Sequence, residues 1–128
     1  MLREMASAAR LTAYAARKVA LSQEIRRGLC SGDLDADRVY GYIRSLQALD
    51  VELEELRAEF ESLWLARARR SEIHVALGYY AGLRTRYWAA IRWLEGQRQA
   101  LLADQPVDAS LTTYDAGGYR TLWHNWPD

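Results

Sequence analysis

The side chains best suited to chemistry in this chain are its two histidines, its carboxylates and its single cysteine. A helical site for two metal ions needs a Glu-x-x-His spacing, which puts both ligands on one face. Glu72 and His74 are two positions apart and would point to different faces of a helix, so the spacing does not predict a metal site. Nucleophilic catalysis needs a histidine beside the nucleophile, and no motif places one beside Cys30 or a serine.

The densest group of carboxylates lies in the acidic stretch between residues 50 and 61. Glu55 and Glu59 would share one face of a helix, but Glu52 and Glu61 flank them, which is typical of a solvated acidic side. No glycine-rich loop suited to phosphate binding occurs in the chain. The sequence therefore predicts no catalytic residue, no cofactor and no metal ion.

Aromatic residues near the C-terminus form a different candidate site. Tyr119, Trp123, His124 and Trp126 are close together in a segment rich in turn-forming residues. Such side chains can stack on a sugar ring, but aromatic residues more often anchor a tail or fill a protein interface. Because soluble proteins rarely expose so much apolar surface, we expect this tail to fold back over the protein, or to dock on a second copy or on a missing domain.

Two long helices are predicted in the first half of the chain. The first covers residues 2 to about 27, where alanine is frequent and favours helix, and Gly28 is its expected end. The second runs from about Ala36 to Arg69, with Asp35 or Asp33 as its cap. Its apolar residues alternate at spacings of three and four, which predicts one buried stripe: Val39, Tyr42, Leu46, Leu49, Leu53, Leu56, Phe60 and Leu63.

A third helix is predicted from Glu72 to about Ala103. It repeats the alternation of apolar residues in Ile73, Ala76, Tyr80, Leu83, Tyr87, Ala90 and Leu94. A second stripe has small side chains, and we expect it to lie against the alanine-rich first helix: Gly78, Gly82, Thr85 and Ala89. The predicted fold class is all-α: three long helices in a largely antiparallel bundle over residues 1–104, and an extended aromatic C-terminal tail over residues 105–128.

Composition and charge narrow the possible partners. Lys plus Arg and Asp plus Glu both number 17, so the chain lacks the basic surplus of a general nucleic-acid binder. No apolar run of the length that crosses a membrane is present, so we expect no membrane partner. The single cysteine excludes an intramolecular disulfide, which fits a reducing compartment and favours the cytoplasm.

One stretch resembles a known protein family. The segment from Phe60 to Ile73 reads FESLWLARARRSEI, and a helix through Leu77, Leu83 and Tyr87 follows it. This resembles the C-terminal helical region of bacterial family 20 glycoside hydrolases, the β-N-acetylhexosaminidases, where a Leu-Trp-Leu-type segment ends one long helix and a short arginine-containing turn leads into the next. The resemblance covers roughly residues 60–94. Where that family often has Asn and Pro, this chain has Ala68-Arg69-Arg70-Ser71.

The resemblance implies an accessory role rather than a catalytic one. The catalytic Asp-Glu pair of that family and its substrate-binding tryptophans lie in a (β/α)-barrel, and this chain has no alternating strand and helix pattern from which to build one. The implied partner is a missing catalytic domain of the same polypeptide, with a second copy of the chain as the alternative. A stand-alone interaction module that dimerises through the stripe from Val39 to Leu63, and an enzyme of unknown type, remain open readings.

Overall fold

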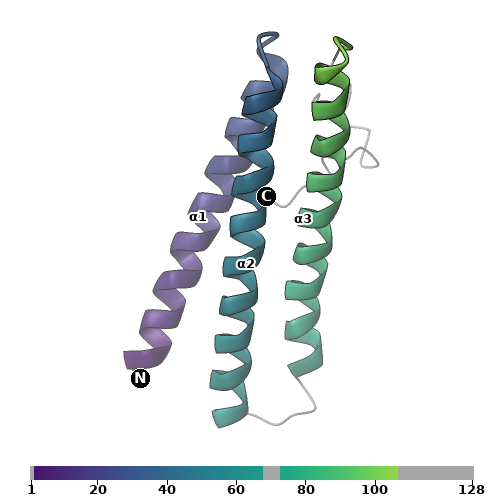
Figure 1. Ribbon diagram of the computed structural model, residues 1–128. Helices are drawn as coiled ribbons and strands as arrows, with labels where there is room; N and C mark the ends of the chain where they lie inside the picture. The colour runs from purple at the N-terminus through teal and green to yellow at the C-terminus, as the bar shows by residue number, and fades with distance from the viewer. Residues whose placement is uncertain (1, 68–72, 107–128) are drawn as a thin grey trace, which may run out of the picture.

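The structure is a computed structural model that describes residues 2–67 and 73–106, and these residues form three long helices (Figure 1). The helices are α1 (Leu2–Cys30), α2 (Ala36–Arg67) and α3 (Ile73–Leu102). The chain runs up α1, down α2 and up α3, so consecutive helices are antiparallel (Figure 1). The predicted all-α bundle of three helices is confirmed, whereas the predicted break at residues 69–71 and nearly all of the predicted tail lie outside the described residues.

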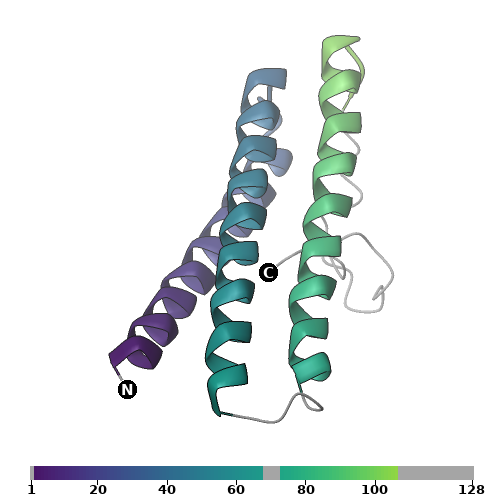
Figure 2. The ribbon, with the colours of Figure 1, turned by 60° about the horizontal axis from the view of Figure 1, so that its bottom comes forward.

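The three helices do not pack equally. α2 is the central helix, and it packs more extensively against α3 than against α1. Figure 2 shows α2 and α3 running nearly side by side along their whole length, while α1 crosses α2 at an angle. As a result, α1 is close to α2 near the loop that joins them and diverges from it toward Leu2 (Figures 1 and 2).

The predicted stripe of α2 forms the centre of the core. Six of its residues are at most 7% exposed, namely Val39, Tyr42, Leu46, Leu49, Leu53 and Leu56. Phe60 and Leu63, at the far end of the stripe, are only half-buried. Full burial of an aliphatic side chain contributes about 1.5–3 kcal/mol to stability. The stripe from Val39 to Leu56 is therefore occupied within the chain, whereas its far end keeps accessible apolar surface.

The end of α1 differs from the prediction. The helix continues past Gly28 to Cys30, so the prediction that Gly28 ends it is wrong. Gly28 is buried, and a Cβ atom at this position would lie 2.9 Å from Cζ of Tyr42. The glycine is thus explained by the close approach of α2, and the change of chain direction falls instead at Gly32, whose φ is 78°.

The flanking segments of α2 and α3 show why these helices begin and end where they do. At the start of α2, a side-chain oxygen of Asp35 accepts a hydrogen bond from the backbone N–H of Arg38 at 2.8 Å, which confirms Asp35 as the cap. After α3, Asp104 has a φ of 54° and its N–H donates to the Leu101 carbonyl at 3.2 Å. The N–H of Gln105 donates to the Ala100 carbonyl at 2.8 Å, which completes a Schellman motif.

The small stripe of α3 does not face α1, so that prediction is wrong. No atom of the described residues would lie within 4 Å of a Cβ added at Gly78 or Gly82, and Thr85 and Ala89 are exposed. α1 instead reaches α3 at Tyr87, which also belongs to the large apolar stripe that packs toward α2. The bulky side of α3 buries far more apolar surface than the small side could, so both α1 and α2 contact that side.

Candidate functional site at the open end of the bundle

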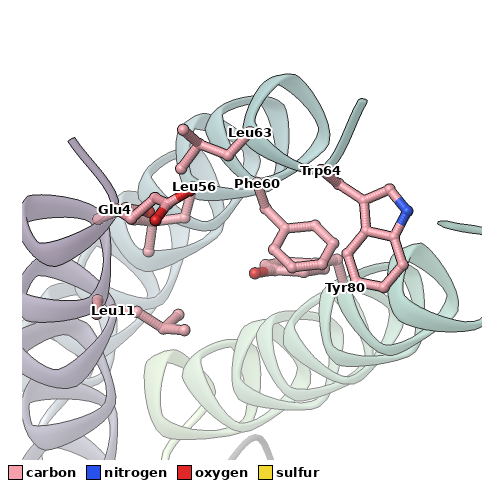
Figure 3. Close-up of a pocket in the computed structure, with 9 residues that line it drawn as sticks. Glu4, Leu11, Leu56, Phe60, Leu63, Trp64 and Tyr80 are labelled. Atoms are coloured by element: carbon pink, nitrogen blue, oxygen red, sulfur yellow. The ribbon is translucent and has the colours of Figure 1, made fainter. Parts of the chain in front are cut away.

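The divergence of α1 leaves a hollow between the three helices, which we call the open-end hollow. Its volume is about 440 Å³, within the usual range for pockets that hold small ligands. α1 contributes one wall, the last turns of α2 contribute another, and α3 contributes a tyrosine (Figure 3). The lining residues are Glu4, Ser7, Ala8, Leu11, Leu56, Phe60, Leu63, Trp64 and Tyr80.

The hollow exists because the inward side of α1 changes in size along the helix. Near the α1–α2 loop, this side carries large buried residues, including Ile25 and Leu29. Toward the N-terminus, Ser7 and Ala8 take the corresponding positions and are too short to reach across to α2. Leu11 lines the hollow and is still 42% exposed, so the space is not filled by α1.

Aromatic rings form the opposite wall. The ring of Phe60 lies 5.5 Å from that of Trp64 and 5.5 Å from that of Tyr80, measured between centroids, and both pairs are tilted by 39°. Figure 3 shows these rings grouped on one side of the hollow, with Leu11 on the other. Burial raises the pKa of Tyr80, which keeps its phenol neutral. The hollow therefore offers a mainly apolar, aromatic surface, and Glu4 is the one charged residue among those that line it.

Arginines of α1 hold it beside α2 despite the lack of apolar contact at this end. Arg10 pairs with Glu59, and Arg17 pairs with Glu52. The prediction that these two glutamates belong to a solvated acidic side is therefore wrong, since each contacts a helix distant in sequence. Arg3 lies two helical turns before Arg10, and its Nη2 donates to the Ser62 hydroxyl at 3.2 Å.

A second group of polar residues joins α2 to α3. Asp50 is 8% exposed and accepts hydrogen bonds from Nε of Arg84 at 3.0 Å and from Nε1 of Trp88 at 3.2 Å. The Arg84 guanidinium also lies 5.0 Å from the centre of the Trp88 ring. The acidic stretch that begins at Asp50 was expected to be solvated, so the burial of Asp50 departs from the prediction. Its place directly after Leu49 of the buried stripe was the available signal, because that position borders the helix interface.

Two further carboxylates of the acidic stretch, those of Glu54 and Glu61, also form ion pairs with an arginine. Arg57 bonds Glu54 from Nη2 and Glu61 from Nη1, each at 2.7 Å. The hydrogen bond from Arg57 lowers the pKa of Glu54. Glu55, in contrast, is exposed as expected. Ionised carboxylates held by arginine suit a structural role, since a general acid needs a carboxyl group with a raised pKa.

The described residues include only some of the candidates that the sequence offered. Tyr119, Trp123, His124 and Trp126 lie outside the described residues, as does Glu72. His74 is exposed in the first turn of α3, and Cys30 is exposed at the end of α1. Within residues 2–67 and 73–106, no group of three or more His, Cys, Asp or Glu side chains could hold a metal ion.

Comparisons with known proteins add no family assignment. Searches against protein-family models, curated proteins and solved structures give no significant match. None of the helices in the described part of the chain has the length and apolar character needed to cross a membrane.

Proposed function

We propose that this chain is a non-catalytic helical accessory domain, comparable to the C-terminal region of a family 20 glycoside hydrolase, which supports a catalytic barrel in the same polypeptide. The observation that carries the proposal is an uncharged face along α1, which we call the outer face. Its residues follow one another at spacings of three and four and are all exposed: Leu2, Met5, Ala9, Thr12, Ala16 and Val19.

The outer face has the properties of a surface that another protein covers. Leu2 is 84% exposed and Met5 is 64% exposed, although both are large and apolar. The hydroxyl of Thr12 is satisfied by the Ala8 carbonyl at 2.9 Å, so it does not need water. Because the charged residues Arg3, Arg10 and Arg17 turn toward α2, the outer face is left without charge. Aligned apolar side chains of this kind mark interaction sites.

The barrel is the partner that the resemblance favours. In the family it resembles, the helical region follows the barrel, so the barrel would precede Leu2. The most exposed apolar residues of the outer face, Leu2 and Met5, lie at that same end of α1. The arginine-paired carboxylates of α2 support the non-catalytic part of the proposal, because hydrolysis of a glycoside needs two carboxyl groups that flank a sugar.

Two measurements test this function. A coding sequence with a barrel-length reading frame upstream of Leu2 would support the accessory role, and a nearby start codon would contradict it. The purified chain should also release no product from aryl N-acetylglucosaminides above a matched blank. Turnover that is lost when a single carboxylate, such as Glu59→Gln, is replaced would overturn the non-catalytic assignment.

A stand-alone dimerisation module is the second candidate function, and the small residues of the outer face favour it. Ala9 and Ala16 would let two copies of α1 approach closely. The test is the molar mass in solution over a range of concentrations, measured for the natural chain and for Ala9→Glu. A dimer that Ala9→Glu disrupts, and that the control Ser45→Glu on an exposed position of α2 does not, would favour this function over the accessory role.

A further inference from the structure

The open-end hollow is a site without an occupant among the described residues, and its chemistry indicates what would fill it. Phe60, Trp64 and Tyr80 offer aromatic rings at the spacing of contacting pairs, about 5.5 Å between centroids. Such rings gain additional stabilisation from a further ring packed at an angle against them. A flat apolar group of the size of an indole therefore suits the hollow better than an aliphatic or charged group.

The chain itself carries such groups within reach. The described residues end at Pro106, and the segment that follows contains Tyr114, Tyr119, Trp123 and Trp126. The hollow is near the start of α3, and the path along α3 from Leu102 back to Tyr80 is about 33 Å at a rise of about 1.5 Å per residue. An extended chain covers at most about 3.3–3.6 Å per residue, so about ten residues beyond Pro106 are needed to span this path.

The length of chain beyond Pro106 divides the aromatic residues into those that can reach the hollow and those that cannot. The eight residues from Pro106 to Tyr114 span at most about 26–29 Å, which is less than this path, whereas Tyr119, Trp123 and Trp126 are far enough along the chain. Trp123 directly follows Leu122, whereas Trp126 stands between Asn125 and Pro127, so the sequence around Trp123 is the more apolar. The left-handed backbone at Asp104 also turns the chain out of the axis of α3 before Pro106.

We propose that residues 119–126 return along α3 and that the indole of Trp123 occupies the open-end hollow, against Phe60 and Tyr80. The segment then completes the core at the end where α1 diverges. This site is distinct from the outer face of α1, so it is independent of the partner proposed above.

Trypsin digestion of the full chain tests the proposal. Arg120 is the one basic cleavage point among residues 107–128, and cutting there releases residues 121–128, which mass spectrometry detects. Cleavage of a docked segment requires its prior release and is therefore slow. We expect Trp123→Ala to speed this cleavage by about tenfold, because proteolysis follows the population of the released segment. Trp126→Ala should change the rate much less.

A second variant fills the hollow from the other wall. Ala8→Trp places an indole of α1 in the space that Trp123 would take and should speed cleavage at Arg120 as well. Ala58→Trp is the matched control, because Ala58 is exposed on α2 and does not line the hollow. Circular dichroism verifies that each variant keeps its helices, and Trp123→Ala gives the answer even if Ala8→Trp does not fold.

The alternative occupants give different results. Equal cleavage rates in the natural chain, Trp123→Ala and Ala8→Trp would overturn the proposal. Protection that increases with protein concentration would also overturn it, because the segment would then dock on a second copy. Protection that is independent of concentration and is lost in both variants is the result that supports it.

Discussion

The phenol oxygens of Tyr14 in α1 and Tyr87 in α3 share a hydrogen bond in the interior of the protein, across 73 positions of sequence. Tyr14 is 2% exposed and Tyr87 is fully buried. Either hydroxyl can act as the donor, and each provides the partner that a buried polar atom requires. The pair links two helices that otherwise pack mainly on α2, and it lies between the well-packed end of the bundle and the open-end hollow.

Removing one hydroxyl of this pair should cost more than removing both. Tyr14→Phe leaves the Tyr87 hydroxyl buried without its partner, so we expect a loss of about 1–3 kcal/mol in the free energy of unfolding. The double variant with Tyr87→Phe should lose less than Tyr14→Phe alone, because it leaves no buried hydroxyl without a partner. Urea unfolding of the four proteins gives this coupling, and strictly additive losses would contradict it.

The same pair predicts a loss of stability at high pH. Burial raises the pKa of Tyr14 from 10.0 to about 12, and it also raises the pKa of Tyr87. The unfolded chain therefore gives up these protons at lower pH than the folded chain does. The contribution of the tyrosine pair to the free energy of unfolding is fully present below about pH 10 and is lost as the pH rises toward 12. Urea midpoints measured from pH 8.5 upward should fall, and less so in the double phenylalanine variant; an equal fall in both proteins would exclude the pair as the cause.

Two glycines in helices should respond oppositely to alanine. Gly28→Ala would place a Cβ 2.9 Å from Cζ of the buried Tyr42, and such overpacking typically costs about 1–3 kcal/mol. Gly96→Ala is the matched control, because no atom in the described part of the chain lies within 4 Å of the added Cβ. It should stabilise α3 by about 0.5–1 kcal/mol through helix propensity. Thermal melting compares the two, and a stabilising Gly28→Ala would disprove the close contact with Tyr42.

The end of α3 offers a stabilising substitution. Asp104 has a positive φ of 54°, which a residue with a side chain adopts at a cost that glycine avoids. Asp104→Gly should therefore raise stability by about 0.5–1 kcal/mol, in keeping with glycine as the usual residue at this position of a Schellman motif. Asp104→Val should lower the melting temperature, because a β-branched side chain fits this conformation poorly. A higher melting temperature for Asp104→Val than for Asp104→Gly would contradict the Schellman motif at the end of α3.

The central stripe of α2 predicts a large effect at one position and a small effect nearby. Leu53 is 2% exposed, so Leu53→Ala should destabilise the chain by about 2–5 kcal/mol through lost burial and the remaining cavity. Val51 is 61% exposed on the same helix, and Val51→Ala should change stability by less than about 0.5 kcal/mol. Chemical unfolding measures both, and similar losses would mean that the stripe does not face the core.

The sequence by itself determined the three helices and the face that α2 buries. The alternation from Val39 to Leu56 and the cap at Asp35 depend on residues close together in the chain, so their spacing was enough to predict them. The same local reasoning placed α3 from its apolar stripe, within one residue at each end of the helix.

Tertiary structure decided the features that depend on how the helices meet. Gly28 is inside α1 because Tyr42 approaches it, Glu59 is paired because Arg10 lies opposite, and the small side of α3 is exposed because its bulky side meets both neighbours. The open-end hollow arises where Ala8 faces Phe60 and Tyr80 across diverging helices. The divergence results from the combined sizes of side chains on separate helices, and the periodicity of one helix contains no information about the lengths of the side chains that will face it.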